Sequence, residues 1–169
     1  MDPDNNLYYI GKLLLLILAQ VFVINQLHIA GYITPMIYLI FVYEYPTTQN
    51  RSVLLSLGFF VGLILDILTD SLAFNTIALI IVTYVRPYLL GFIFGIAVEQ
   101  KSFKFKDITL FQKLSYLGLL VVIHHSVYFI AEGMSISNAL LITKKIVTTS
   151  LVSFMLLLLL LSLFSKQKK

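Results

Sequence analysis

The chain alternates long apolar runs with short polar breaks. A helix that crosses the hydrocarbon core of a bilayer needs about 20 mainly apolar residues. Runs of this kind, bounded by polar, glycine or proline positions, recur along the sequence. We therefore predict six membrane-spanning helices, over residues of about 7–27, 32–45, 52–71, 72–98, 114–131 and 136–165.

The second segment is the shortest of the six, and it has Pro35 near its start. Proline removes a helical hydrogen bond and clashes with the preceding turn. The segment is either a short tilted helix or a helix that begins at His28 and kinks. The stretch that follows it, Pro46–Arg51, is a clear break.

The first segment is interpreted as a retained span. Its start, Met1–Asn6, is acidic where a signal peptide would be basic, and no small-x-small cleavage site follows the apolar run. Lys12 lies about one turn inside this segment, so its long side chain is expected to reach the lipid headgroups.

The cations outside the spans test this arrangement. With six spans, the loops around 25–31, 70–75 and 132–138 contain no Lys or Arg. Positive loops face the cytoplasm, so both termini of this multi-pass membrane protein are predicted to lie in the cytoplasm. The cations that fall on the cytoplasmic side are Arg51, Lys101, Lys104, Lys106, Lys113, Lys166, Lys168 and Lys169.

Composition supports a membrane protein and excludes several other classes. Only 12% of the 169 residues are charged, 59% are hydrophobic, and the mean hydropathy is +0.95. A soluble domain carries about 25% charged residues, so the sequence predicts an all-α polytopic fold with one integral membrane domain, 1–169. The absence of cysteine excludes disulfides, thiolate metal sites and a cysteine nucleophile. The net charge of +4 comes from short clusters between apolar runs, which does not indicate nucleic-acid binding.

Two carboxylates in the third segment are the sharpest candidate feature. Asp66 and Asp70 are four residues apart and share one helix face. Counted from Ser52, Asp66 lies roughly 21 Å from the cytoplasmic edge and Asp70 roughly 27 Å. A carboxylate inside the membrane costs several kcal/mol unless it is paired or hydrated. Asp66 therefore has two interpretations. It marks a polar cavity, an ion site or a partner contact, or it belongs to a structural ion pair inside the bundle. Asp70 is expected to cap the helix at the membrane interface.

Other polar residues inside the spans are candidate partners of Asp66. Lys144 and Lys145 lie at about its depth in the sixth segment, and only one of the two can point inward. Arg86, which precedes Pro87, lies deeper and is expected to hydrogen-bond carbonyl groups at a kink.

His124 and His125 lie mid-membrane and cannot both face the same way. Their spacing lacks the convergent ligands of a metal site, which favours hydrogen-bonded structural histidines, with a proton relay to Asp66 as the alternative. No cofactor is expected.

Glycine pairs predict close helix packing. Gly58 and Gly62 in the third segment, and Gly91 and Gly95 in the fourth, form GxxxG patterns that allow neighbouring helices to approach. Because Gly58, Gly62, Asp66 and Asp70 share one face, that face must meet protein, either within the bundle or on a partner.

A cationic and aromatic segment, 101–106, is expected to bind anionic lipid at the cytoplasmic surface. No phosphate-binding loop, catalytic triad or metalloprotease helix is visible, so no catalytic residues are expected and the chain is predicted not to be an enzyme.

Residues 58–71 resemble the Gly-x-x-x-Gly-Leu-x-x-Asp helix of the rod shape-determining protein MreD family, and Gly58, Gly62, Leu63 and Asp66 match it. The resemblance extends to Tyr84–Pro87, to the opening 25–35, to the length of the chain and to the number of spans. One difference is that Leu72–Asn75 stands where the family has small residues after the acidic pair.

The resemblance implies a non-enzymatic scaffold or adaptor of the bacterial cell-elongation machinery, located in the bacterial inner (cytoplasmic) membrane. Its implied partner is a bitopic MreC-like protein. MreB, the glycosyltransferase RodA and the transpeptidase that works with RodA would act with it in lateral peptidoglycan synthesis. The resemblance also implies a fold similar to the substrate-binding S components of energy-coupling transporters.

The alternative function is a small-solute-binding transport subunit of that kind. It would use the region of Asp66, His124 and Lys144 as an outward-facing pocket.

Overall fold

The computed structural model describes residues 3–27, 31, 33–47, 50–95, 98, 108–133 and 139–166. Within these ranges the chain forms six α-helices and one short 3-10 helix, which confirms the predicted all-α fold class. The elements are α1 (Pro3–Phe22), η1 (Ile24–Gln26), α2 (Ile40–Glu44), α3 (Arg51–Thr69), α4 (Phe74–Phe94), α5 (Leu110–Glu132) and α6 (Ala139–Lys166).

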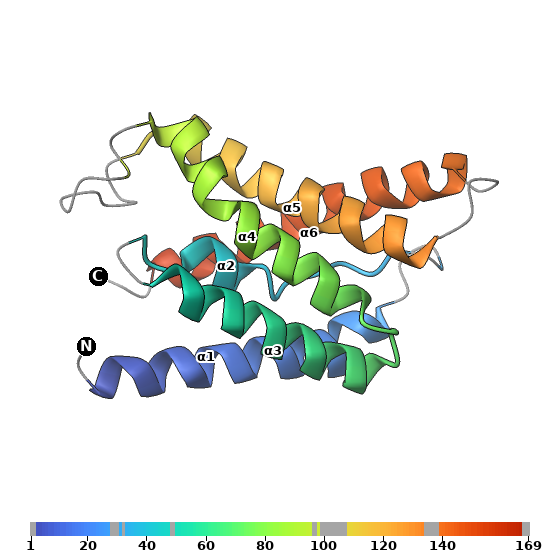
Figure 1. Ribbon diagram of the computed structural model, residues 1–169, viewed down its shortest axis with the longest axis horizontal. Helices are drawn as coiled ribbons and strands as arrows, with labels where there is room; N and C mark the ends of the chain where they lie inside the picture. Colours follow the sequence, from blue (N-terminus) through green and yellow to red (C-terminus); the bar gives the residue numbers. More distant parts are fainter. Residues whose placement is uncertain are drawn as a thin grey trace.

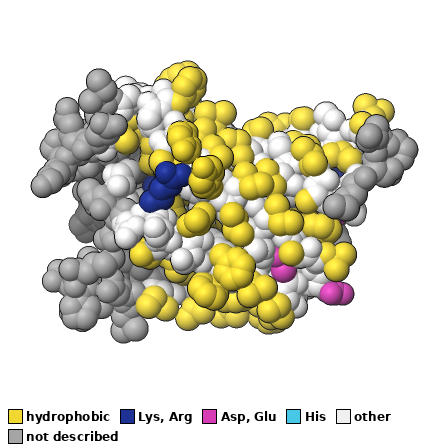
Figure 2. Space-filling view, in the orientation of Figure 1, with side chains coloured by type: hydrophobic (Ala, Val, Ile, Leu, Met, Phe, Trp, Pro, Cys, Tyr) yellow, Lys and Arg dark blue, Asp and Glu magenta, His cyan; other side chains and the backbone are white. Residues whose placement is uncertain are grey.

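Four of the helices are long and apolar enough to cross a membrane. These are α3, α4, α5 and residues 139–163 of α6, and residues 10–26 add a shorter apolar helix. On the face shown in Figure 2, hydrophobic side chains are spread over much of the described surface. A multi-pass membrane protein is therefore the class that the fold supports.

The long helices run side by side and define two ends of the molecule (Figure 1). We name these after residues at the two ends of α3, the Arg51 end and the Asp70 end. Helix α1 begins and α6 ends at the Arg51 end, where α4 also ends and α5 begins (Figure 1). The turn between α3 and α4 and the end of α5 lie at the Asp70 end. This arrangement agrees with an even number of crossings.

The prediction of a membrane-spanning helix over residues 32–45 is wrong. Only the five residues of α2 are α-helical, and the preceding residues 33–39 carry the chain from the Asp70 end toward α2 without forming a regular helix (Figure 1). This stretch is buried, with Tyr38 only 1% exposed and Leu39 fully enclosed. Pro35 lies within it and lacks the amide hydrogen that a helix would use.

The backbone of this irregular segment is paired by side chains from the neighbouring helices. Gln20 on α1 donates from Nε2 to the Pro35 carbonyl at 2.9 Å and accepts from the Ile37 amide at 2.8 Å. The Met36 amide donates to the Ser153 hydroxyl on α6 at 3.1 Å. No water is available inside a bilayer to satisfy backbone groups, so irregular chain persists there only where protein supplies the partners.

Local sequence explains where several helices begin. The Asn50 side chain accepts from the Ser52 amide at 2.9 Å and caps α3. Thr109 and Gln112 form a capping box at the start of α5. Pro87 does not interrupt α4, which continues through it to Phe94.

Lys12 does not follow the expectation that it extends to the lipid headgroups. Its ammonium group forms an ion pair with Glu44 at the end of α2, and both side chains are partly buried. This pair joins α1 to α2, two elements separated by the irregular segment.

Candidate functional site

The Asp66 carboxylate lies at the first turn of α4. Its Oδ1 atom accepts from the Asn75 amide at 2.9 Å, the Asn75 side-chain nitrogen at 3.0 Å and the Ser71 hydroxyl at 2.6 Å. Its Oδ2 atom accepts from the Thr76 amide at 2.8 Å and the Thr76 hydroxyl at 2.6 Å. Five donors thus surround a carboxylate that is only 7% exposed.

This arrangement caps a neighbouring helix. The first amides of a helix have no partner within it, and the residue before α4 is Ala73, whose side chain makes no capping bond. Asp66 on α3 accepts from two of these amides in its place. The positive end of the α4 dipole also stabilises the charge. The buried carboxylate is therefore satisfied by hydrogen bonds and needs no cation.

The predicted close approach at Gly58 and Gly62 is confirmed, and it occurs within the bundle. A Cβ atom on Gly62 would lie 2.4 Å from the Cα of Thr76 and 2.8 Å from its amide nitrogen. A Cβ atom on Gly58 would lie 3.0 Å from the Thr83 methyl group. Gly62 thus allows α4 to begin directly against α3, one turn before the carboxylate that caps it.

Asp70 has a separate role at the end of the same helix. It is the C-cap residue of α3, in the left-handed region with φ 54° and ψ 46°, and its amide donates to the Asp66 carbonyl. Its side chain is exposed. The prediction that Asp70 caps the helix end is confirmed, whereas its carboxylate does not join the Asp66 cluster.

The predicted pairing of Asp66 with Lys144 or Lys145 is wrong. All donors to Asp66 within the described residues come from Ser71 and the first turn of α4. Lys145 instead donates to Glu132 at 2.8 Å and lies 5.6 Å from the centre of the Phe129 ring. Lys144 is exposed on α6. Similar depth in the membrane did not identify the partner of Asp66, because the amides at the start of α4 already satisfy its carboxylate and no ion pair is needed.

Arg86 is buried near the Arg51 end and is only 4% exposed. One of its terminal nitrogens donates to the Tyr45 carbonyl, and its guanidinium lies 5.8 Å from the centre of the Tyr45 ring. Arg86 therefore holds the chain after α2 against α4. It hydrogen-bonds a carbonyl group, as predicted, but this carbonyl belongs to Tyr45 and not to a kink in α4.

His124 and His125 are both completely buried and point to different partners. The Nδ1 atom of His125 lies 2.8 Å from the Val121 carbonyl and its Nε2 atom 3.0 Å from the Ser153 hydroxyl. The Nε2 atom of His124 lies 3.2 Å from the Tyr38 hydroxyl. The prediction of hydrogen-bonded histidines that face different ways is confirmed.

A chain of hydrogen bonds connects His124 to Asp66. The Tyr38 hydroxyl donates to the Asn75 side-chain oxygen at 2.7 Å, and the Asn75 side-chain nitrogen donates to Asp66. An amide neither gains nor releases a proton near neutral pH, so Asn75 links the two groups mechanically and does not relay protons. Within the described residues, no group of three or more His, Cys, Asp or Glu side chains comes together.

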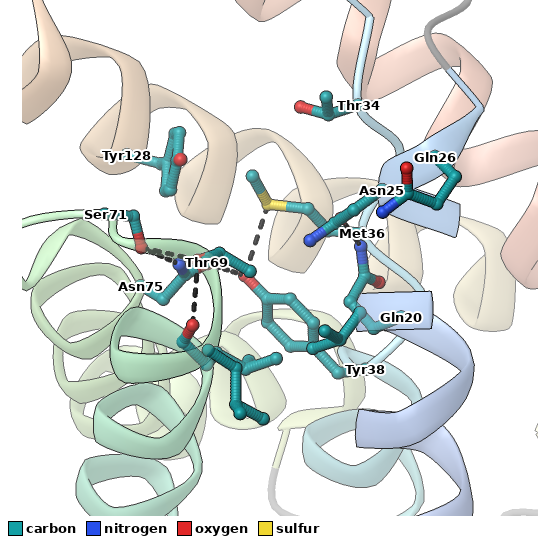
Figure 3. Close-up of a pocket in the computed structure, with 13 residues that line it drawn as sticks. Gln20, Asn25, Gln26, Thr34, Met36, Tyr38, Thr69, Ser71, Asn75 and Tyr128 are labelled. Carbon is teal, nitrogen blue, oxygen red and sulfur yellow. Dashed lines mark hydrogen bonds between the residues drawn. The ribbon is translucent and has the colours of Figure 1, made fainter. Parts of the chain in front are cut away.

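A polar cavity lies beside this chain of hydrogen bonds, where α1, residues 34–38, the α3–α4 turn and α5 meet. Figure 3 shows the labelled side chains around this common space. The cavity has a volume of about 360 Å³. Its polar lining includes Gln20, Asn25, Tyr38, Ser71, Asn75 and Tyr128. Asp66, His124 and Lys144, the residues expected to form an outward-facing pocket, do not line it.

Sequence reasoning missed the polar residues that organise this region. Gln20, Tyr38 and Asn75 each lie within or beside an apolar run and carry no charge. A polar side chain that is buried in a membrane-spanning segment indicates a partner at the same depth. That signal is present at Gln20, although sequence alone does not reveal which backbone it meets.

The second glycine pair behaves differently from the first. A Cβ atom on Gly91 or Gly95 would meet no atom within 4 Å. Gly95 is the C-cap of α4, with φ 61°. Within the described residues this pair makes no close helix contact inside the bundle, and binding of a partner helix at this pair stays a prediction.

An open apolar groove of about 590 Å³ lies between α4 and α5 at the Arg51 end. Phe92 and Phe111 line it and are 83% and 78% exposed. Gly118 on α5 lies in the same groove. The segment 101–106, expected to bind anionic lipid, lies outside the described residues.

Comparison with known proteins finds no matching family, no matching curated protein and no matching solved structure.

Proposed function

We propose that this protein is a membrane scaffold or adaptor subunit of the bacterial cell-elongation machinery, as its resemblance to the MreD family implies. The observation that carries the proposal is the geometry of the matching residues. Gly58, Gly62 and Asp66 bring α4 against α3 and cap its first turn. A motif that builds a fixed helix hairpin suits a protein whose task is to hold other membrane proteins in place.

The proposed main partner is the membrane-spanning helix of an MreC-like bitopic protein. MreB, RodA and its transpeptidase are proposed as further members of the assembly, and anionic lipid as the partner of residues 101–106. The α4–α5 groove is the surface that we assign to the partner helix. Its exposed aromatic residues, Phe92 and Phe111, offer apolar surface to a second helix, and Gly118 lies in the same groove.

Phe92→Ala tests this assignment. Phe92 lines the groove and its side chain is 83% exposed, so the fold is expected to persist while the partner helix loses an aromatic contact. Co-purification with the MreC-like protein in mild detergent should fall several-fold. Leu140→Ala is the matched control, because Leu140 on α6 is 87% exposed and is not among the residues that line the groove. Wild-type recovery of the partner by both variants would rule out the groove as its binding surface.

A second candidate function is a small-solute-binding transport subunit. The polar cavity beside Tyr38 and Asn75 favours it, because ligand sites are concave and combine an apolar lining with a few polar groups. A thermal-shift screen with vitamins tests this function, since a specific ligand at 100 times its Kd stabilises by about 2.7 kcal/mol. The absence of any shift across the screen would count against it.

A further inference from the structure

The described residues that line the cavity shown in Figure 3 carry no formal charge. No Lys, Arg, Asp, Glu or His is among these described residues. The nearest buried carboxylate, Asp66, lies behind Ser71 and Asn75 and already accepts five hydrogen bonds. An ion that entered this space would lose its hydration without meeting a counter-charge.

Three polar groups of the wall have no hydrogen-bond partner among the described residues. The Tyr128 hydroxyl and the Thr34 hydroxyl are two of them. The third is the side-chain nitrogen of Asn25. Gln20 uses its oxygen for the Ile37 amide, so its nitrogen must donate to the Asn25 oxygen at 2.7 Å. That contact leaves the Asn25 nitrogen free to donate to a guest.

Apolar side chains complete the wall. Val21 on α1 and Leu65 and Leu68 on α3 lie around the same space as the polar groups. The volume of about 360 Å³ falls within the range of about 300–1,000 Å³ typical of ligand pockets. The irregular residues 34–38 form part of the lining, and non-helical chain at membrane depth is characteristic of solute sites in membrane proteins.

We infer that this cavity binds an uncharged, water-soluble solute that offers a carbonyl or hydroxyl oxygen to Asn25 and Tyr128 and an apolar edge to Leu65 and Leu68. The inference rests on the second candidate function and adds the chemical class of the ligand. It requires nothing of the scaffold role, which uses a groove at the other end of the molecule.

Engineered cysteines test the inference directly, because the chain contains no cysteine of its own. Thr34→Cys places one thiol in the cavity wall. Its reaction rate is measured with three methanethiosulfonate reagents that carry a hydroxyethyl, a trimethylammonium-ethyl or a sulfonatoethyl group. Leu140→Cys on α6, where the native side chain is 87% exposed, normalises the intrinsic reactivity of each reagent. Leu68→Cys is the second cavity position, should Thr34→Cys fail to fold.

After normalisation, the uncharged hydroxyethyl reagent should modify the cavity thiol at least about tenfold faster than either charged reagent, because only the ions must lose hydration without a counter-charge. Equal or faster entry of a charged reagent would overturn the inference. If an ionic vitamin then stabilises the protein in the thermal-shift screen, the solute-binding function stands and only the assigned chemistry is wrong. Failure of all three reagents at both positions would overturn both.

The same chemistry could come from the ester carbonyls and acyl chains of a lipid. The labelling is therefore repeated in detergent with increasing phosphatidylglycerol. An unchanged hydroxyethyl rate agrees with a water-soluble guest, whereas protection that increases with the lipid would assign the cavity to lipid and overturn the inference.

Discussion

Gly62 on α3 lies against the backbone of Thr76 on α4, so closely that a Cβ atom at Gly62 would be 2.4 Å from the Thr76 Cα. One turn further along α3, Asp66 accepts from both the amide and the hydroxyl of the same Thr76. Gly62 makes room for the start of α4, and the Asp66 carboxylate accepts hydrogen bonds from the first amides of that helix. Gly62 and Asp66 therefore act together to fix the junction between α3 and α4.

Gly62→Ala should destabilise the bundle. The atom in the way belongs to the backbone of Thr76, which cannot rotate aside. We expect the free energy of unfolding to fall by about 1–3 kcal/mol, as for other overpacked sites. Thermal unfolding in detergent measures this. Gly11→Ala is the control, because its added methyl group meets nothing and alanine is the better helix former. Equal melting temperatures for both variants would contradict the close approach.

Asp66→Asn should destabilise the protein in the absence of any partner. The amide that replaces one carboxylate oxygen cannot accept from the Thr76 or Asn75 amide, and the charge at the start of α4 is lost. The expected loss is about 1–3 kcal/mol, typical of a buried donor left without an acceptor. Asp70→Asn is the matched control. Its side chain is exposed, and asparagine tolerates the left-handed conformation of the C-cap.

If Asp66→Asn leaves the purified protein as stable as the wild type but abolishes partner binding, the capping role is wrong and Asp66 acts on the partner.

Gln20→Leu should disturb the irregular segment. Leucine has a similar size but leaves the Pro35 carbonyl and the Ile37 amide unpaired inside the bundle. We expect a loss of at least about 2 kcal/mol, because each buried backbone group without a partner costs about 1–3 kcal/mol. Faster amide hydrogen exchange at Ile37 is the local readout. Unchanged exchange and melting would show that the segment does not depend on Gln20.

Glu132→Gln should have only a small effect. The pair with Lys145 is partly exposed, with side-chain exposures of 37% and 26%, so water and salt screen it. We expect a loss below about 1 kcal/mol that shrinks further at high ionic strength. Melting curves at low and high salt check this. A loss as large as that of Asp66→Asn would mean that this ion pair supports the bundle in the way the Asp66 cap does.

Single cysteines should report opposite sides of the membrane at the two ends of α3. Leu72, in the α3–α4 turn, is 80% exposed, and Ser52 at the start of α3 is also exposed. With the Arg51 end in the cytoplasm, an impermeant maleimide should label Leu72→Cys in intact spheroplasts and Ser52→Cys only after permeabilisation. The reverse pattern would contradict the predicted orientation.

Several features could be predicted from local sequence. The apolar runs around α3, α4, α5 and α6 identify the long helices, because a bilayer-spanning segment must be apolar over a fixed length. Asn50, Thr109 and Asp70 mark helix ends through bonds to residues a few positions away. Gly58 and Gly62 predict a close contact with a neighbouring helix, because the absence of a side chain allows the two backbones to approach.

The sequence by itself therefore determined the all-α membrane class, the long helices and the residues on the buried face of α3. Only the tertiary structure decided what those residues meet. Asp66 caps α4 instead of pairing with a lysine, Gln20 pairs the backbone of a span that is not a helix, and a Cβ atom at Gly91 would meet no atom within 4 Å. The physical reason is that a buried polar group accepts any partner that satisfies it. Spacing along the chain gives the depth of such a group, but the three-dimensional packing selects the partner.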